Sequence, residues 1–556
     1  MRPANLYFDF MMEVLLSDQE NQAPPSANTG KLVDLRAQVE ARRAEEARHL
    51  GKVEGKKTPP GGPDDPEFVR ACYNANELGD GILFAALHRG RFVFDASAGE
   101  WLAWQGHHWQ RDTTGTALTA VEAVAQAYLK EVQAIARQLA ETTDEDEADR
   151  MQRRQAQVMR RVNRLRSRRG RENCLIFAAT CGEESLVVTT DKLNEKPWLL
   201  ACANGVVDLR TGLLRPGDPN DLLTLAASVP FPDGVEEYLT TGENSPCPLW
   251  ENFIPEIMND EQDRADYLRR LFGYGITGLV REHVFAVFFG HGRNGKGTMI
   301  ETLKAILGPM AKPVEAELLL DQGRPGNPGA PSPHIMQLHG LRLIFASESE
   351  KGRRFSASRV KWLSGGDTLT GRTPHDRHPT IFAPSHLLIL QTNDKPRADA
   401  QDFAFWSRLH LVEFSMAYVE RPKAANERKL DETLRERLFK EGPGILAWLV
   451  RGCLEWQKQG LNPPRSVLAA TAEYRQSEDD LFAWIEDKCI EAEDATVTAK
   501  AAYQSFRDWW TENISDKPPS QKRFGDSMTK RGYMKDRGAS GGNRRYIGLE
   551  LREMFN

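Results

Sequence analysis

The chain has 556 residues, enough for about three or four domains of ordinary size. Its 40% hydrophobic and 27% charged residues are typical of a soluble globular protein, and its net charge of −6 excludes a histone-like binder that is basic throughout. The seven cysteines contain no C-x-x-C pair, which argues against a zinc ribbon or a disulfide framework and favours a reducing cytoplasm.

The first 65 residues are mostly polar and predict a flexible tail, with one short apolar run that lacks the features of a signal peptide. No apolar stretch approaches the ~18 residues that a membrane span needs, so we expect no membrane contact. Residues 66–115 contain aromatic-rich, strand-like pieces, among them "WLAWQGHHWQ".

From residue 117 the pattern becomes helical, and residues 152–171 contain nine arginines and no acid. One interpretation is a solvated helical hairpin whose acidic and basic parts neutralise each other. The other is a surface that contacts phosphate backbones. The sequence does not separate the two. Residues 197–233 then predict short strands joined by turns, and residues 249–280 return to helical periodicity.

A glycine-rich loop follows an apolar, strand-like run, "EHVFAVFF", and precedes a helix-like "MIETLKAIL". Gly290, Gly295 and Lys296 fit the phosphate-binding pattern G-x-x-x-x-G-K-[ST], but Gly297 occupies the hydroxyl position and Thr298 comes one residue late. In such a loop, backbone N–H groups and the helix N-terminus face phosphate oxygens. The residues expected to hold a nucleotide are Gly290, Gly292, Arg293, Asn294, Gly295, Lys296, Gly297 and Thr298.

Three further apolar runs follow, each with a polar residue at one end. "LRLIFASESE" ends in Glu348 and Glu350, and we expect this strand to lie beside the strand of the glycine-rich loop, where an acid would hold Mg²⁺ or orient water. "HLLILQTN" ends in Asn393, which would contact the γ-phosphate. "FWSRLHLVEF" has Arg408 near its start, and a guanidinium there would stabilise transferring phosphate.

Two basic regions are candidates for contact with DNA. Residues 351–378 contain seven Lys or Arg against two Asp, and "TLTGRT" and "PTIF" predict a hairpin with "PHDRH" at its tip. Residues 516–556 contain ten Lys or Arg against five acids. There "QKRFGDSMTKRGYMKD" predicts a recognition helix and "NRRYIGLEL" a wing strand, while the preceding aromatics are expected in the core. The basic candidates are Lys522, Arg523, Lys530 and Arg531.

Five stretches resemble the superfamily 3 helicases, in particular the phage, plasmid and poxvirus primase-helicase group. They are "GHGRNGKGT", "LIFASESE", "RVKWLSGGDTLTGR", "LLILQTNDKP" and "FAFWSRLHLVEF". Upstream, "NGVVDLRTG" and "LFGYGITG" resemble the region before the ATPase, and "DLFAWIEDKC" to "YIGLELR" resembles a C-terminal winged helix. The resemblance covers roughly residues 85–550.

The resemblance implies an α/β protein with an AAA+-like P-loop ATPase core that forms a ring, expected to be a hexamer, and moves 3′ to 5′ on single-stranded DNA. It implies ATP and Mg²⁺ as cofactors, with Lys296 as the Walker A lysine and Glu348 as the main Walker B acid. Asn393 is then the sensor, and Arg408 the finger donated to a neighbouring subunit. Thr298 and Glu348 are the expected magnesium contacts. The expected DNA contacts are Lys361, Arg372, His375, Arg377 and His378.

Two departures from the family pattern are visible. Ser347 replaces a first acid, so Glu350 stays open as an alternative to Glu348 for the Walker B role, and Gly297 replaces a hydroxyl residue. We expect no primase domain in this chain and a location in a bacterial host's cytoplasm or nucleoid, with a primase or polymerase as partners. The alternatives are an ATPase that remodels or packages nucleic acid without unwinding, and a replication initiator or adaptor with a structural nucleotide site.

The sequence thus predicts six segments. They are a flexible tail (1–65), an N-terminal α+β domain with a helical, Arg-rich insertion (66–245), a helical collar (246–283), the ATPase domain (284–450), linker or lid helices (451–477) and a winged-helix-like C-terminal domain (478–556).

Overall fold

The computed structural model describes residues 62–182, 185–322, 332–348, 351–372, 374, 379–514, 516–533, 535–536 and 544–552. The chain divides into two compact units, residues 1–74 and 75–556. Within the first unit the described residues form one helix, α3 (Pro66–Asn74). Among the described residues, no helix is both long and apolar enough to cross a membrane.

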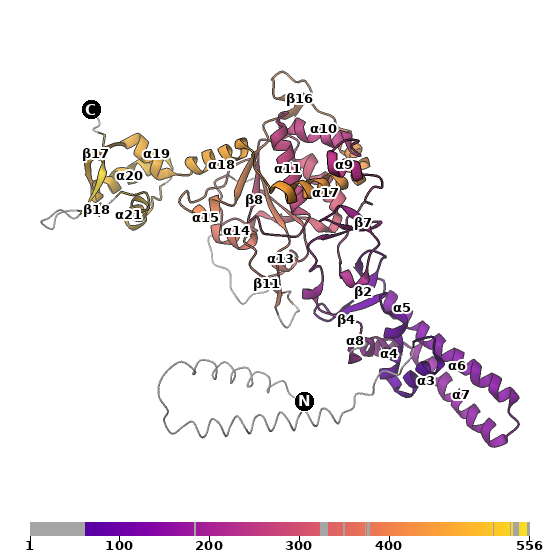
Figure 1. The fold of residues 1–556 in the computed structure, drawn as a ribbon. Helices are drawn as coiled ribbons and strands as arrows, with labels where there is room; N and C mark the ends of the chain where they lie inside the picture. The colour runs from indigo at the N-terminus through magenta and orange to yellow at the C-terminus, as the bar shows by residue number, and fades with distance from the viewer. Residues whose placement is uncertain are drawn as a thin grey trace, which may run out of the picture. The chain divides into compact units, whose positions relative to one another are not determined.

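The second unit begins with a small sheet flanked by helices (Figure 1). Its strand order is β3-β2-β1-β4, with β1 antiparallel to β2 and parallel to β4. The predicted strand-like pieces are therefore present at residues 92–111, whereas residues 76–88 are helical. The elements are α4 (Asn76–His88), β1 (Phe92–Asp95), β2 (Glu100–Trp104), β3 (Trp109–Arg111), α5 (Thr116–Ala120) and β4 (Val187–Val188).

The arginine-rich segment lies on a helical hairpin of α6 (Glu122–Glu141) and α7 (Glu145–Leu165), followed by α8 (Arg168–Thr180). Asp144 caps α7 by accepting the N–H groups of Asp146 and Glu147. Most of the arginines form ion pairs with acids on α4, α6, α7 or α8: the pairs are Arg153–Asp149, Arg154–Glu131, Arg161–Asp80, Arg164–Glu77, Arg166–Glu122, Arg168–Glu172 and Arg171–Glu122. This pairing favours the structural interpretation over a phosphate-binding surface.

A three-stranded antiparallel sheet, β5-β6-β7, and three helices connect this region to the central sheet. The strands are short and joined by tight turns, as the sequence predicts. Their bounds are β5 (Leu199–Cys202), β6 (Gly205–Asp208) and β7 (Leu213–Arg215), followed by α9 (Glu236–Thr241), α10 (Pro248–Ile257) and α11 (Gln262–Gly275).

A five-stranded parallel sheet forms the centre of the second unit, with the order β14-β8-β13-β10-β9. The expectation that the acid-bearing strand lies beside the strand of the glycine-rich loop is wrong, because β13 lies between them. The strands are β8 (Phe285–Phe289), β9 (Ala311–Glu315), β10 (Leu343–Glu348), β13 (Leu387–Thr392) and β14 (Leu409–Glu413).

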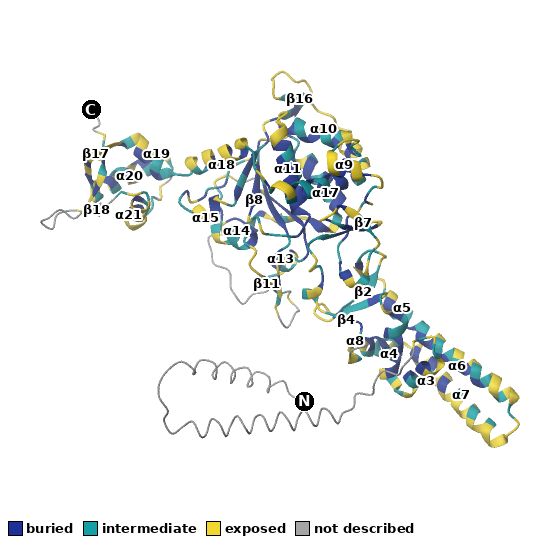
Figure 2. Cartoon of the chain, in the orientation of Figure 1, coloured by how far each residue is buried: buried dark blue, intermediate teal, exposed yellow. Residues whose placement is uncertain are grey.

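Both faces of this sheet are covered. Along β8, Ala286 and Phe288 join one apolar cluster, and Phe285 and Val287 join another on the opposite face. This alternation explains why β8 reads as a continuous apolar run, as buried parallel strands do. Figure 2 shows the strands in the colour of buried residues. The helices are α12 (Lys296–Leu307), α13 (Pro333–Met336), α14 (Ala357–Ser364), α15 (Phe403–Trp406), α16 (Leu434–Lys440) and α17 (Gly442–Gln459).

Two small pairs of strands stand apart from the central sheet. β11 (Leu369–Gly371) and β12 (Thr380–Phe382) pair antiparallel, which confirms the predicted hairpin. β15 (Ala417–Val419) and β16 (Glu427–Lys429) pair in parallel.

The C-terminal elements have a small core of their own. They are α18 (Arg465–Ser477), α19 (Asp480–Lys488), β17 (Cys489–Thr498), α20 (Ala499–Asn513), α21 (Gln521–Lys530), β18 (Lys535–Asp536) and β19 (Arg545–Leu551), with β19 between β17 and β18. As predicted, Phe506 and Trp509 of α20 are buried, and they pack with Trp484 and Phe524.

Candidate nucleotide-binding site

The glycine-rich loop joins β8 to α12 at the carboxyl edge of the central sheet. Gly295, just before the helix, has φ +85°, and a Cβ there would lie 2.3 Å from Ile257 Cγ2. At Gly290, φ is +154° and a Cβ would lie 2.3 Å from the Phe414 carbonyl oxygen. Both positions therefore require glycine, both for the backbone conformation and for the space. The predicted order of strand, loop and helix is confirmed here.

Lys296 begins α12 and is almost completely buried, with 2% of its surface exposed. Its ammonium group donates to the Gly290 and Thr392 carbonyl oxygens, the latter at 3.1 Å, and lies 3.5 Å from Asn393 Oδ1. Among the described residues no carboxylate forms an ion pair with it. Burial lowers the pKa of Lys296 to about 8. The loop thus holds a desolvated cation against neutral oxygen atoms.

Asn294 stabilises the loop through two hydrogen bonds of its side-chain amide. It is 3% exposed, its Nδ2 donates to the Phe414 carbonyl at 3.4 Å, and its Oδ1 accepts the Lys296 N–H at 3.4 Å. Gly292 and Arg293, by contrast, are exposed on the outer side of the loop, and Arg293 adopts a positive φ of 61°. Asn294 therefore fixes the loop, and the Arg293 carbonyl is also held, because it accepts the Tyr418 N–H at 2.7 Å.

The missing hydroxyl at Gly297 is not a consequence of crowding. A Cβ added at Gly297 would meet nothing within 4 Å, so a serine would fit there. Thr298 is half-buried on the first turn of α12. Its hydroxyl and the Glu348 carboxylate are the kinds of oxygen ligand that Mg²⁺ takes. Among the described residues, no group of three or more His, Cys, Asp and Glu side chains is placed to hold a metal ion.

Glu348 ends β10 on the same edge of the sheet. It is 7% exposed, and it pairs in register with Thr392 of β13, which in turn pairs with Phe289 of β8. Arg353 Nη1 lies 3.9 Å from the Glu348 carboxylate. The carboxyl ends of three parallel strands therefore bring together the glycine-rich loop, Asn393 and Glu348. Glu350 lies outside the described residues.

A second lysine on this edge was not predicted. Lys395 follows Asn393 by two residues; its ammonium lies 4.6 Å from the centre of the Phe289 ring and 3.3 Å from the Glu413 carboxylate. Phe289 immediately precedes Gly290, so Lys395 lies close to the start of the loop. The "NDKP" stretch offered a signal for it, because a cation that follows the polar end of a buried strand shares that strand's edge.

Arg408 lies at the opposite edge of the sheet. Its carbonyl accepts the Phe285 N–H at 2.8 Å, and Leu409 pairs in register with Phe285, the first residue of β8. At about 3.3 Å per residue, the length of β8 separates this edge from the loop by roughly 16 Å. Arg408 therefore does not join the site of its own chain. Its Nε is buried without a hydrogen-bond partner among the described residues, and its Nη1 donates to the Ala404 carbonyl at 2.5 Å.

The predicted DNA contacts are only partly described. Arg372 follows β11 and is half-buried. Lys361 lies on α14, where its ammonium is 2.9 Å from Asp402. His375, Arg377 and His378 lie outside the described residues.

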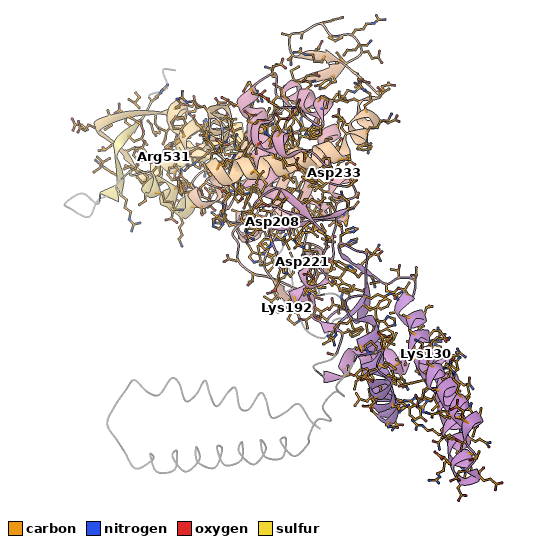
Figure 3. All side chains as sticks on the ribbon, turned by 45° about the vertical axis from the view of Figure 1, so that its right-hand side comes forward. Lys130, Lys192, Asp208, Asp221, Asp233 and Arg531 are labelled. Atoms are coloured by element: carbon orange, nitrogen blue, oxygen red, sulfur yellow. The ribbon has the colours of Figure 1, made fainter. Side chains whose placement is uncertain are left out.

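The C-terminal basic residues differ from one another. Lys522 and Lys530 are exposed, and Arg523 lies 3.9 Å from Asp399. Arg531, labelled in Figure 3, donates to both carboxylate oxygens of Asp479 at 2.8 Å. Asp479 therefore competes with the phosphate that this arginine was predicted to contact.

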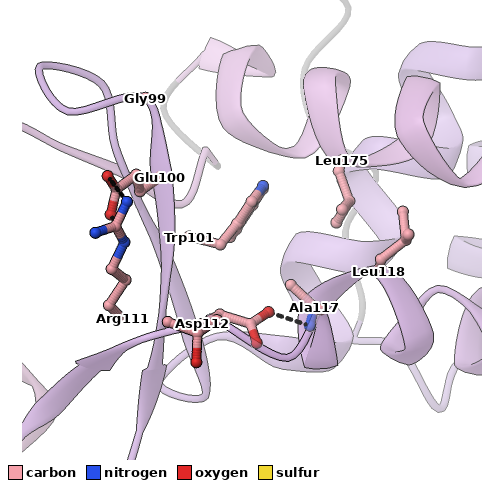
Figure 4. Close-up of a pocket in the computed structure, with 10 residues that line it drawn as sticks. Gly99, Glu100, Trp101, Arg111, Asp112, Ala117, Leu118 and Leu175 are labelled. Atoms are coloured by element: carbon pink, nitrogen blue, oxygen red, sulfur yellow. Dashed lines mark hydrogen bonds and ion pairs between the residues drawn. The ribbon is translucent and has the colours of Figure 1, made fainter.

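A separate cavity lies in the N-terminal part of the second unit, between β2, β3, α5 and α8 (Figure 4). Its volume is about 480 Å³, and it is lined by Gly99, Glu100, Trp101, Arg111, Asp112, Thr113, Gly115, Ala117, Leu118 and Leu175. Arg111 forms an ion pair with Glu100, and Asp112 accepts the Ala117 N–H at 2.8 Å. Its charged groups thus have partners within the protein, and none of its lining residues belongs to the glycine-rich loop.

Comparison with known proteins gives one family match and several relatives. The "D5 N terminal like" family model matches residues 81–259, a range that includes "NGVVDLRTG" and ends before the glycine-rich loop. The chain is 27% identical over 342 residues to "Putative helicase L207/L206" of Acanthamoeba polyphaga mimivirus, covering 59% of this chain and 35% of that protein. It is 26% identical to "Putative helicase 121R" of Invertebrate iridescent virus 3, covering 59% and 36%.

A poxvirus protein also matches: "Primase D5" of Fowlpox virus is 22% identical, covering 45% of this chain and 31% of that protein. The chain thus spans about a third of the length of these relatives. Among solved structures, the apo NrS-1 C terminal region (305-718) is 10% identical with a TM-score of 0.44, covering 85% of this chain and 99% of that one, a likeness too distant to carry an argument.

The names of these relatives describe putative helicases and a primase. The chain thus contains a segment, residues 81–259, that matches the D5 N terminal like model, and it is similar over about half of its length to proteins of mimivirus, an iridescent virus and a poxvirus.

Proposed function

We propose that this protein is an ATP-dependent, ring-forming superfamily 3 DNA helicase with an AAA+-like core and a C-terminal winged helix. The observation that carries the proposal is the buried ammonium of Lys296, which the loop holds beside Asn393 without a described carboxylate partner. A desolvated cation at the start of a helix, beside the exposed residues Gly292, Arg293 and Gly297, is suited to bind an anionic phosphate chain, because backbone N–H groups at such a helix start would face the phosphate oxygens.

Hydrolysis would use residues from three neighbouring strand ends. Lys296 would neutralise the β- and γ-phosphates, and Asn393 would contact the γ-phosphate and the attacking water. Glu348 is buried at the same edge and would orient that water or hold magnesium through water. A magnesium ion bound with the nucleotide would neutralise charge on the phosphates, held by Thr298 or by a water beside Gly297.

Arg408 would act on the nucleotide of a second copy of the chain. Since it lies at the edge opposite its own loop, only a neighbouring subunit can bring a loop to it. A guanidinium supplied in trans stabilises the charge of the phosphoryl-transfer transition state. This arrangement requires a head-to-tail contact between subunits, which forms a ring when its rotation closes, and the family resemblance favours a hexamer.

Single-stranded DNA would pass the β11–β12 hairpin, and the basic helix α21 would contact the duplex or a partner protein. These contacts are electrostatic, so binding would tolerate sequence and weaken with salt. By resemblance, translocation runs 3′ to 5′ in the replication of a phage, prophage or plasmid in a bacterial cytoplasm, together with a primase or polymerase.

ATP hydrolysis with and without single-stranded DNA, and displacement of a strand from forked duplexes with either tail, test this proposal. We expect DNA-stimulated hydrolysis, displacement on the fork with a 3′ tail, and loss of both in Lys296→Ala. DNA-stimulated hydrolysis without displacement on either fork would contradict helicase activity and favour a remodelling or packaging ATPase.

A mixing assay tests the ring. Arg408→Ala should bind ATP but not hydrolyse it, and adding Lys296→Ala subunits should restore part of the activity, because a mixed ring contains interfaces with an intact loop and an intact arginine. An absence of rescue at every ratio would argue against shared sites.

A further inference from the structure

Lys361 has an acidic partner of its own chain. Its ammonium lies on α14, 2.9 Å from Asp402 Oδ2, and the two side chains are 34% and 23% exposed. Partly shielded from water, such a pair is stronger than a fully exposed one, because solvent screens it less. A lysine in this pair is a poor candidate for a free phosphate contact.

Asp402 uses its other carboxylate oxygen to cap α15. Its Oδ1 accepts the Phe405 N–H at 3.0 Å, and its carbonyl accepts the Trp406 N–H at 3.1 Å. One carboxylate therefore joins α14 to the first turn of α15. An asparagine at this position would keep the cap and lose the charge.

α15 is a single turn whose end positions Arg408. The Arg408 N–H donates to the Phe405 carbonyl at 3.1 Å, and its guanidinium donates to the Ala404 carbonyl. Phe405 is buried, with ring-centre distances of 5.5 Å to Phe285 and 5.2 Å to Phe355. Because α15 is so short, a shift of its cap is carried directly to Arg408.

At its other end, α14 leads into the β11–β12 hairpin. Gly365 and Gly366 lie between the last helical residue, Ser364, and β11, and Gly366 has φ +83°. The hairpin and the arginine thus connect through α14, the Lys361–Asp402 pair and α15.

We infer that Lys361 is a positioning residue, which couples the hairpin that meets DNA to the arginine that meets a neighbouring subunit's ATP. This inference rests on the proposed function. A displacement of the hairpin by DNA moves α14, the ion pair moves the cap of α15, and Arg408 shifts with it. Lys361 then sets how strongly DNA stimulates hydrolysis, and it does not hold the DNA itself.

The test is a double-mutant cycle with Lys361→Met and Asp402→Asn, which asks whether the two residues act as one unit. The readouts are the stimulation of kcat by single-stranded DNA and the Kd for that DNA without nucleotide. We expect each single variant to lower the stimulation at least about fivefold, in the range of typical coupling between sites. The double variant should lose no more than either one, with the Kd for DNA within about twofold of wild type.

Two further variants separate coupling from a general structural effect. Lys361→Arg keeps the charge and the pair, and should retain most of the stimulation. Lys196→Met is the matched control, because it breaks another lysine–carboxylate pair of 2.9 Å, and Asp221 keeps Arg215 as a partner. It should change neither readout.

Other outcomes would overturn the inference. If Lys361 contacts DNA, Lys361→Met weakens DNA binding, whereas Asp402→Asn frees the lysine and leaves or strengthens that binding. Stimulation that survives in both single variants overturns the coupling alone. A wild-type protein whose hydrolysis does not respond to DNA overturns the proposed function as well.

Discussion

Two cations with little exposed surface, Arg161 and Lys296, have opposite kinds of partner. Arg161 is 10% exposed on the helical hairpin and pairs at 2.7 Å with Asp80, which also accepts the Tyr128 hydroxyl at 3.0 Å. Lys296 is 2% exposed and has only carbonyl and amide oxygens around it among the described residues. Burying an unpaired charge costs free energy that the fold alone does not recover. Arg342, 4% exposed, is also held only by carbonyl oxygens among the described residues, so burial without a carboxylate does not by itself mark a ligand site. Under the proposed function, Arg161 stabilises the fold, whereas Lys296, at the glycine-rich loop, binds an anionic ligand.

The largest effect is expected on activity at Lys296. Lys296→Ala should lower ATP hydrolysis by about 1000-fold, because phosphoryl transfer depends on stabilisation of charge at the transferred group. The same change should leave the melting temperature equal to or above that of wild type, since it removes a desolvated charge. Steady-state kinetics and thermal unfolding measure the two. A large drop in melting temperature would mean that Lys296 is structural.

Arg161 should show the reverse pattern. Arg161→Met leaves Asp80 buried without its cation and should lower the free energy of unfolding by about 3 kcal/mol, measured in urea at pH 8. Burial already raises the pKa of Asp80 to about 6, so at pH 5 the carboxyl of the variant is neutral and the loss should shrink.

The control for this pair is Arg154→Met, which breaks an ion pair of 3.0 Å with Glu131 whose arginine side chain is 49% exposed. It should cost less than about 1 kcal/mol at either pH. Equal losses for Arg161→Met and Arg154→Met would contradict the comparison.

A smaller effect is expected beside the lysine. Thr298→Val should raise the magnesium concentration needed for half-maximal hydrolysis by about tenfold if the threonine hydroxyl helps to hold the ion. Adding Gly297→Ser to this variant should bring the required magnesium concentration most of the way back to the wild-type value. The space at residue 297 is open, and a serine would place a hydroxyl in the usual position. Magnesium titration of hydrolysis measures both. An unaffected Thr298→Val would indicate that water completes the magnesium shell.

The local parts of the site were predictable from sequence. An apolar strand, two glycines with positive φ, a lysine and a helix are adjacent in the chain, so their order fixes their geometry. The order of the strands was not predictable, because apolar periodicity identifies strands without saying which neighbours they choose. The placement of β13 between β8 and β10 follows from pairing across long stretches of chain.

Ion pairs between residues that lie far apart in the chain could not be predicted from the sequence either. Lys361 and Asp402 are 41 residues apart, and Asp80 and Arg161 are 81 residues apart. A basic run looks the same in sequence whether its charges face solvent, DNA or acids of another helix. For the arginine-rich segment, only the fold separates the two interpretations that the sequence left open.

The most direct test of the central claim is the uptake of protons when ATP binds. Burial lowers the pKa of Lys296 to about 8, and a bound phosphate chain would raise it. Calorimetric titration with Mg·ATP at pH 8, in two buffers with different heats of ionisation, counts the protons. We predict an uptake of about half a proton per site in wild type, and an affinity that falls as the pH rises above 8. Lys296→Met should show neither the uptake nor tight binding, and binding of wild-type affinity in that variant would contradict the account.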